Sequence, residues 1–211
     1  MNKLGKFIVI EGIDGCGGET QTNLLSDFLS KKGFNVNLLS YPGYSRPIGH
    51  VIHNFLHKEK GYDYNINTET LVYFADFTED TENMQKWLNN GNIIISDRYF
   101  TSTIVYQCLK GYDEEKLIKL SEMFNLVKPD LCIYVDISAE TSFNRKSKEK
   151  EGSDHLDKHE SNTKFLGEVA QRYKDVIKRN IYCDWEIIDG EKSIEEVFKQ
   201  ILQVINKRLG I

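Results

Sequence analysis

The chain has 211 residues and a formal net charge of −5, from 27 lysines and arginines against 32 aspartates and glutamates. This length fits one domain over residues 1–211, and the lack of a basic excess or a clustered basic face argues against nucleic-acid binding. The 4 cysteines are widely spaced, and no apolar run is long enough to cross a bilayer. We therefore expect a cytoplasmic protein with reduced thiols that binds neither nucleic acids nor membranes.

Short apolar runs alternate along the chain with amphipathic segments of helical length. We predict strands at residues 7–10, 36–40, 93–96, 131–135 and 185–188. Helices are predicted at residues 19–32, 48–58, 69–89 and 193–209, with Gly33 closing the first and Ser193 capping the last. This alternation indicates an α/β fold, with a five-stranded parallel sheet flanked by helices on both faces. Such sheets bind their ligands beyond the carboxyl ends of the strands.

One segment departs from this pattern, because it is dense in charge and has no apolar stripe. Residues 146–159 read KSKEKEGSDHLDKH. A solvated loop and a mobile lid that closes over phosphates both fit this composition. The groups that such a lid could bring to a phosphate are Lys146, Lys148, Lys150, His155 and Lys158.

A glycine-rich stretch, EGIDGCGGET at residues 11–20, follows the first predicted strand and leads into a helix. The phosphate-binding pattern G-x-x-x-x-G-K-[ST] places backbone N–H groups around phosphate oxygens at the start of a helix. Gly12 and Gly17 occupy its two glycine positions. Gly18 stands at the lysine position and Glu19 at the hydroxyl position, with Thr20 one step later. Taken alone, this stretch is compatible with a phosphate loop and with an ordinary tight turn.

Further motifs follow the other predicted strands. Tyr41-Pro42-Gly43 follows the second strand, DRYFTS at residues 97–102 follows the third, and YQ lies at residues 106–107. Pro129-Asp130 and Val135-Asp136 flank the fourth strand. In this order and spacing the motifs resemble thymidylate kinases over about residues 6–190 of the chain.

The resemblance implies a P-loop kinase in which MgATP donates its γ-phosphoryl group to dTMP, giving dTDP for nucleotide biosynthesis. It also implies a mobile lid at about residues 146–159 and a homodimer, formed through helices such as those at residues 48–56 and 69–89. Through the resemblance, ATP binding is assigned to Gly12, Gly15, Cys16, Gly17, Gly18, Glu19, Thr20 and Arg145. Acceptor binding is assigned to Asp14, Tyr41, Pro42, Arg46, Tyr73, Phe77, Arg98, Thr103, Tyr106 and Gln107.

The resemblance assigns catalysis to Asp14, Asp97 and Arg98, and Mg²⁺ to Thr20 and Asp97 together with ATP. Arg98 matches an arginine that holds the acceptor phosphate, for which a planar guanidinium is suited. Asp97 would orient Arg98 or the metal shell. Asp14 matches a carboxylate that approaches the sugar 3′-hydroxyl, although an aspartate in a turn often bonds only to its own loop.

Two aromatic residues are assigned to the nucleoside by the same resemblance. Tyr73 matches the aromatic side chain that stacks on thymine. Tyr106 matches a tyrosine beside C2′ of the sugar, where it would disfavour ribose. From its sequence context alone, Tyr106 is equally compatible with a core aromatic of its helix.

The chain departs from the family pattern at Gly18 and Phe77. Losing one well-placed electrostatic donor typically costs about 10²–10³ in turnover. Phe77 stands where an arginine that contacts the base or phosphate is usual, and Arg46 is a candidate to replace it. Three alternatives follow: a lid cation replaces the lysine, the protein binds nucleotides with weak or no catalysis, or it phosphorylates another monophosphate. The first is favoured by Gly15, because the lid supplies charge in relatives that lack an arginine there.

Overall fold

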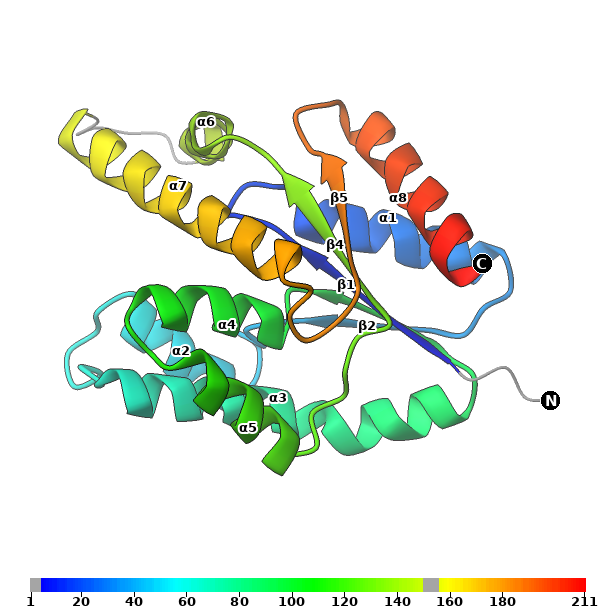
Figure 1. The fold of residues 1–211 in the computed structure, drawn as a ribbon, viewed down its shortest axis with the longest axis horizontal. Helices are drawn as coiled ribbons and strands as arrows, with labels where there is room; N and C mark the ends of the chain where they lie inside the picture. Colours follow the sequence, from blue (N-terminus) through cyan, green and yellow to red (C-terminus); the bar gives the residue numbers. More distant parts are fainter. Residues whose placement is uncertain (1–4, 150–155) are drawn as a thin grey trace.

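The computed structural model describes residues 5–149 and 156–211. Its centre is one parallel sheet with the strand order β2-β3-β1-β4-β5 (Figure 1). The strands are β1 (Lys6–Glu11), β2 (Val36–Ser40), β3 (Ile93–Asp97), β4 (Leu131–Asp136) and β5 (Trp185–Asp189). All five predicted strands are confirmed, each within about one residue at either end.

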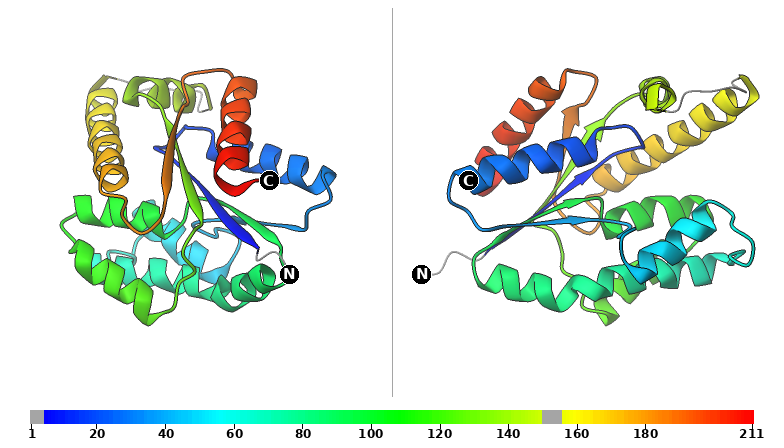
Figure 2. Two further views of the ribbon diagram at one scale, coloured as in Figure 1. Left: turned by 45° about the vertical axis from the view of Figure 1, so that its right-hand side comes forward. Right: turned by 180° about the vertical axis from the view of Figure 1, so that it is seen from behind.

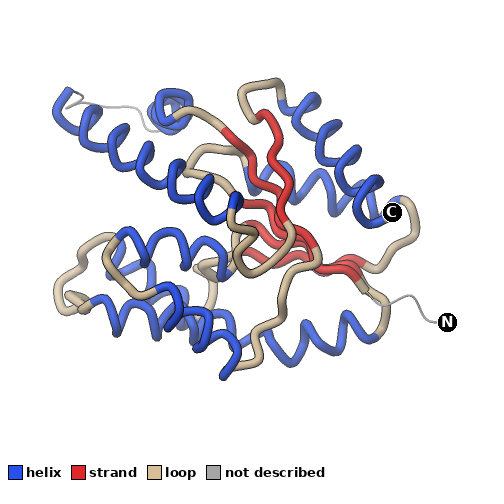
Figure 3. The backbone as a smooth tube through the Cα atoms, viewed as in Figure 1, coloured by secondary structure: helices blue, strands red, loops and turns tan. Residues whose placement is uncertain are grey.

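Eight helices lie within the described residues. They are α1 (Gly18–Lys31), α2 (Pro47–Leu56), α3 (Ile66–Asn89), α4 (Phe100–Leu109), α5 (Glu114–Met123), α6 (Ala139–Glu149), α7 (Leu156–Lys178) and α8 (Ile194–Leu209). Helices α1 and α8 cover one face of the sheet, and α3, α4 and α7 cover the other (Figure 2). The tube view places the strands between these two layers (Figure 3). The predicted α/β fold with helices on both faces is confirmed.

The three central strands form the core because their side chains are buried on both faces of the sheet. The apolar residues of β1, Phe7 to Ile10, are fully buried. Aromatic rings connect the sheet to the helical layer, with Phe7 and Tyr99 at 5.0 Å and Tyr134 and Tyr173 at 4.9 Å between ring centroids. This rigid centre fixes the carboxyl ends of β1, β3 and β4, from which the loops described below emerge.

The helix boundaries follow local capping chemistry. The Ser193 side chain accepts from the backbone N–H of Glu196, and the Glu196 carboxylate accepts from the backbone N–H of Ser193. The predicted cap is therefore confirmed as a full capping box. Helix α3 begins three residues before the predicted start, because the Asn65 side chain accepts from the backbone N–H of Thr68 at 3.0 Å.

The segment predicted as an irregular charged stretch is partly helical. Helix α6 continues to Glu149 and α7 begins at Leu156, so only residues 150–155 of it lie outside the described structure. Long charged side chains are strong helix formers, which explains helix in a stretch without an apolar stripe. Within the described part of the chain, no helix is both long and apolar enough to cross a membrane.

Candidate active site

The loop between β1 and α1 depends on glycine at three positions. Gly15 and Gly17 have φ angles of 77° and 90°, in the left-handed region that side chains disfavour. A Cβ on Gly12 would lie 2.6 Å from Sγ of Cys16, which leaves room for hydrogen only. Because Gly17 directly precedes α1, the free N–H groups and the positive dipole end of that helix lie at the loop. This geometry favours the phosphate-loop interpretation over a plain turn.

The space beside Gly18 is taken by Asp97, the last residue of β3. A Cβ on Gly18 would lie 2.3 Å from Oδ1 of Asp97, so a side chain at position 18 would displace that carboxylate. Burial raises the pKa of Asp97 to about 6, with nearby carboxylates adding to the effect against the attraction of Arg98. The carboxylate of Asp97, at the end of β3, therefore lies directly beside the loop at Gly18.

Arg98 follows Asp97 in a strained backbone conformation with φ 63°. Its backbone N–H donates to the carbonyl of Ile10 at 2.9 Å, and its carbonyl accepts from the hydroxyl of Ser96 at 2.6 Å. These bonds on both sides hold the residue in this conformation, as expected for strain stored at a functional position. The side chain is thereby positioned before any ligand binds.

Glu11, at the end of β1, anchors the start of α4 from beneath. It is fully buried, and its Oε1 accepts from the backbone N–H groups of Tyr99 at 3.1 Å and Ser102 at 3.2 Å, and from the hydroxyl of Thr101. Its Oε2 accepts from the hydroxyls of Ser102 at 2.6 Å and Tyr173 at 2.8 Å. Sequence reasoning gave Glu11 no role, although a charged residue at the end of an apolar strand was a usable signal.

Asp14 joins two cations. Its Oδ1 lies 2.8 Å from Nη2 of Arg98, and its Oδ2 accepts from Nζ of Lys146, which α6 carries. Burial alone would raise the pKa of Asp14, but the two cations outweigh it and hold the pKa below its ordinary value. Asp14 is therefore ionised at neutral pH and forms a compact charged cluster with Arg98 and Lys146.

A cavity of about 210 Å³, here called the acceptor cavity, lies between α3 and α4 on one side of this cluster. Nine of the ten residues assigned to the acceptor line it, Arg46 being the exception. Three aromatic or aliphatic residues that the sequence did not assign to the acceptor also line it, together with Asp76 and Ser102. The lining residues are Asp14, Tyr41, Pro42, Tyr44, Leu56, Tyr73, Asp76, Phe77, Arg98, Tyr99, Ser102, Thr103, Tyr106 and Gln107.

Arg46 is instead committed to carboxylates of α3. Its Nη2 lies 2.8 Å from Oδ1 of Asp76, its Nε lies 3.3 Å from Oε2 of Glu79, and its Nη1 contacts Asp80. Asp76 also accepts from the backbone N–H of Gly43 at 2.9 Å. The network ties α2 to α3, and the assignment of Arg46 to the acceptor phosphate stays a prediction.

An aromatic ring, a buried amide and a tyrosine form part of the wall of the acceptor cavity. Phe77 is 2% exposed and packs edge-on against the ring of Tyr41 at 5.0 Å. Gln107 is 1% exposed, and neither atom of its amide group has a hydrogen-bond partner among the described residues. Tyr106 lines the cavity with its ring 5.8 Å from the guanidinium of Arg98, so it is more than a core aromatic.

A second cavity of about 620 Å³, here called the donor cavity, lies on the other side of the cluster. Every residue assigned to ATP lines it except Gly12. The loop before α8 also lines the donor cavity, which was not predicted from the sequence. The lining residues are Asp14, Gly15, Cys16, Gly17, Gly18, Glu19, Thr20, Gln21, Asp97, Arg98, Arg145, Lys146, Gly190, Lys192, Ser193, Ile194 and Val197. Asp14 and Arg98 belong to both cavities, so the two meet there.

Arg145 supports the donor cavity through backbone contacts. Its guanidinium donates to the carbonyl of Gly15 at 3.2 Å and to that of Gly190 at 2.9 Å, which ties the loop after β1 to the loop after β5. Among the predicted lid residues, only the side chain of Lys146 falls within the described structure. The side chains of Lys148, Lys150, His155 and Lys158 lie outside it.

Comparison with known proteins decides which family has this arrangement. The family model described as thymidylate kinase matches residues 10–201. The chain belongs to the thymidylate kinase family. It is 35% identical over 208 residues to the thymidylate kinase of Caldicellulosiruptor saccharolyticus, covering 97% of this chain and 98% of that protein. It is 33% identical to the probable thymidylate kinase of Thermococcus kodakarensis and 31% identical to the thymidylate kinase of Thermoanaerobacter sp. (strain X514). These two cover 97% of this chain, and 98% and 99% of the relatives.

Membership of the thymidylate kinase family confirms the resemblance inferred from motif order. It also confirms the P-loop kinase fold, and it identifies the chain as a nucleoside monophosphate kinase, a transferase. The family uses MgATP as its phosphoryl donor. Gly18 lines the donor cavity and the aromatic Phe77 lines the acceptor cavity.

Proposed function

We propose that this protein transfers the γ-phosphoryl group of MgATP to the 5′-phosphate of dTMP, giving dTDP. The observation that carries this proposal is the meeting of the acceptor and donor cavities at Asp14 and Arg98. Phosphoryl transfer needs positioning and charge neutralisation more than covalent chemistry, and both are provided where the cavities meet. The related proteins named above carry the same activity in their names.

The acceptor nucleotide would lie with its phosphate at Arg98 and its base between α3 and α4. Arg98 donates from Nη2 to Asp14 and, over a long 3.4 Å, from Nη1 to the hydroxyl of Ser102, which leaves its remaining N–H groups for two phosphate oxygens. The depressed pKa of Asp14 keeps it an acceptor for a sugar hydroxyl. Gln107 would bind the edge of the base, since its amide has no other partner among the described residues.

ATP would place its phosphates on the loop after β1 and the first turn of α1. The donor set fits Mg²⁺: Asp97 offers a carboxylate whose raised pKa marks it as short of positive charge, and Thr20 offers a hydroxyl. When bound with ATP, Mg²⁺ supplies charge neutralisation at the phosphates. Asp97 and Thr20 would hold it at this side of the loop.

Lys146 is our choice for the cation that replaces the missing phosphate-loop lysine. It lines the donor cavity and already reaches Asp14 at the junction of the two cavities. The exposed fraction of its side chain is 48%, so it can shift by rotamer change to a phosphate oxygen. This favours a working kinase over the alternative of a nucleotide binder with little catalysis. We further propose a cytoplasmic homodimer, on the expectation from the family.

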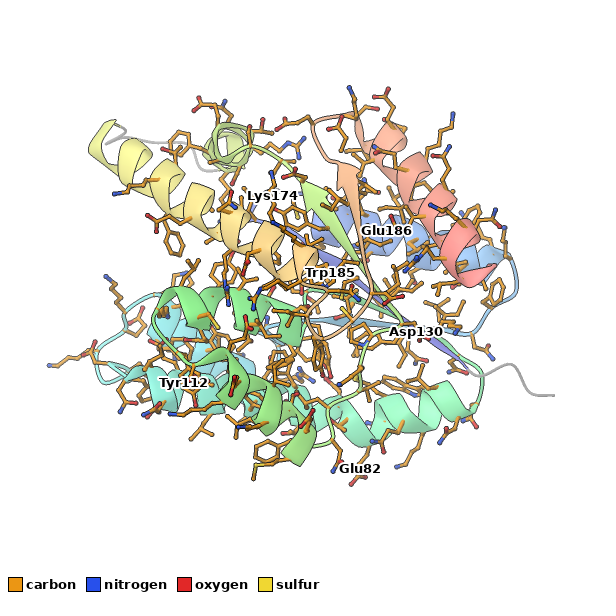
Figure 4. All side chains as sticks on the ribbon, viewed as in Figure 1. Glu82, Tyr112, Asp130, Lys174, Trp185 and Glu186 are labelled. Atoms are coloured by element: carbon orange, nitrogen blue, oxygen red, sulfur yellow. The ribbon has the colours of Figure 1, made fainter. Side chains whose placement is uncertain are left out.

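The test measures ADP formation from ATP and Mg²⁺ with dTMP as acceptor. We expect turnover by the wild type and a loss of about 10²-fold or more in kcat for Lys146→Ala, as for other electrostatic donors. Lys174→Ala is the matched control: Lys174 on α7 is equally exposed, at 46%, and pairs with Asp136 outside both cavities (Figure 4). A wild type without turnover would reject the kinase proposal. Equal activity of the two variants would reject the role of Lys146.

A further inference from the structure

The part of the acceptor cavity bounded by Tyr73, Phe77, Thr103 and Gln107, here called the base end, lacks a group of fixed hydrogen-bonding polarity. Hydroxyl groups and a carboxamide each both donate and accept, and the Phe77 ring does neither. An arginine, a lysine or a free carboxylate would instead impose one polarity on any base bound there. Such groups therefore decide which bases a pocket rejects.

The charged residues among those lining the acceptor cavity do not supply that polarity. Asp14 and Arg98 bind each other at the phosphate end. The side chain of Asp76 is 1% exposed, and its two oxygens accept from Arg46 at 2.8 Å and from the backbone N–H of Gly43 at 2.9 Å. Its acceptor capacity is thus already engaged by groups outside the cavity lining.

Gln107 is the group at the base end that offers a donor and an acceptor side by side. Its amide is buried, and neither its oxygen nor its nitrogen has a partner among the described residues. No contact within this part of the structure therefore fixes which way the amide is turned. A buried amide without partners destabilises the free protein, so a ligand that satisfies it gains affinity.

Pyrimidine bases present either of two edges to such an amide. Thymine and uracil offer the N3–H donor beside the O4 acceptor, whereas cytosine offers the N3 acceptor beside the 4-amino donor. A carboxamide pairs with the first edge in one orientation and with the second after a half-turn. Gln107 can therefore satisfy both edges with two hydrogen bonds each.

We propose that the base end accepts pyrimidine 2′-deoxynucleoside 5′-monophosphates with either a 4-oxo or a 4-amino group. Phe77 is the residue that makes this possible, because it completes the pocket without adding a donor that only a 4-oxo group could satisfy. The inference rests on the proposed function, since it assigns the base of the acceptor to this cavity. It widens the acceptor from dTMP to a class of pyrimidine nucleotides.

The decisive measurement compares dUMP and dCMP, which differ only in the N3–C4 edge of the base. We expect the kcat/KM values of the wild type for the two to agree within about tenfold, because each forms two bonds with Gln107. If the Gln107 amide were held in the one orientation that fits uracil, it could not pair with the N3–C4 edge of cytosine. The buried polar groups of both would then lack partners, and dCMP would be disfavoured by more than about tenfold. That larger preference would overturn the inference.

Measuring dTMP alongside separates the two proposals. No turnover of any monophosphate rejects the kinase proposal, whereas turnover of dTMP and dUMP without dCMP rejects the inference alone.

A variant at Gln107 checks that the amide itself reads both edges. Gln107→Leu keeps a similar volume but removes both polar atoms, so we expect kcat/KM to fall by about tenfold or more for dUMP and dCMP alike. We also expect its Tm to equal or exceed that of the wild type, because a buried unpaired amide is lost. A merely structural role would lower both Tm and activity. An unchanged kcat/KM for dCMP would overturn the inference.

Discussion

At the scale of single residues, the phosphate loop ends in Gly18, where the sequence pattern of such loops places a lysine. The Oδ1 atom of Asp97 lies 2.3 Å from the point that a Cβ on residue 18 would occupy. A ligand cation or Lys146 must therefore balance the phosphates from another direction. Burial, with the carboxylates nearby, raises the pKa of Asp97 to about 6, above its usual range.

Asp97→Asn tests this description through the pH dependence of stability. An unfolded aspartate has a pKa of about 3.9, so the folded chain binds the extra proton between that value and about 6. Asp97 therefore weakens the fold as pH rises through this window, by at most about 3 kcal/mol. We expect Asp97→Asn to be more stable than the wild type at pH 8, with the gain shrinking towards pH 5. Urea unfolding at both values measures it.

The same variant should lose activity while it gains stability. Removing the carboxylate removes the group that we assign to Mg²⁺, so we expect kcat with MgATP to fall by about 10²-fold. A stability difference that does not change with pH would contradict the assigned pKa. Undiminished turnover would show that Asp97 has no part in catalysis.

At the scale of elements, the site depends on how β1 is joined to the start of α4. Glu11 collects five hydrogen bonds there, two from backbone N–H groups and three from hydroxyls. It holds the turn in which Arg98 has its strained backbone. A buried carboxylate with this many donors is costly to remove, because each donor is then left unsatisfied.

Glu11→Ala should therefore destabilise the protein by about 2–5 kcal/mol. Glu11→Gln should cost less than half as much, since the hydroxyls of Ser102 and Tyr173 can turn to accept from its amide. Thermal unfolding measures both. Because Arg98 loses its support, KM for dTMP should rise in Glu11→Gln as well. Equal stability of the two variants would contradict this expectation, because it would mean that the glutamine amide replaces none of the hydrogen bonds of Glu11.

The sequence was informative where one local pattern decides the outcome. Short apolar runs predicted the strands, and Ser193 at the start of an amphipathic segment predicted the cap of α8. It was less informative where a side chain has a choice of distant partners. Arg46 could be placed near the acceptor phosphate by position, but Asp76 and Asp80, 30 and 34 residues later, hold it in the structure. Glu11 likewise gains its role from Tyr173, 162 residues away.

Short helices were also difficult to predict from local sequence patterns. Helix α5 packs Leu117, Ile118 and Leu120 on the core, but it has only 10 residues, too few turns for its apolar face to stand out as a periodic pattern. Helices α6 and α7 extend into the charged segment, where no apolar stripe predicted them. Family resemblance placed nine acceptor residues around one cavity, which periodicity alone could not have done.

At the scale of the whole molecule, two cavities share Asp14 and Arg98 in their linings, and we propose that they bind a nucleotide pair. A protein with a net charge of −5 thus concentrates positive groups at one junction. Arg98 and Lys146 reach it, and the N-terminus of α1 points its dipole there. Anionic ligands are attracted by that local field rather than by the total charge.

A ligand that joins adenosine and thymidine through a chain of phosphates should therefore occupy both cavities at once. Linking turns the second binding event into an intramolecular one, which typically raises affinity by about 10²–10⁴. We expect it to raise Tm by at least about 5 °C more than equal concentrations of ATP and dTMP together.

The matched control joins two adenosines through the same chain of phosphates. It should give no such gain, because the acceptor cavity has a volume of only about 210 Å³ and we propose that its base end accepts pyrimidines. Equal shifts for the two linked ligands would mean that the cavities do not bind donor and acceptor as one path.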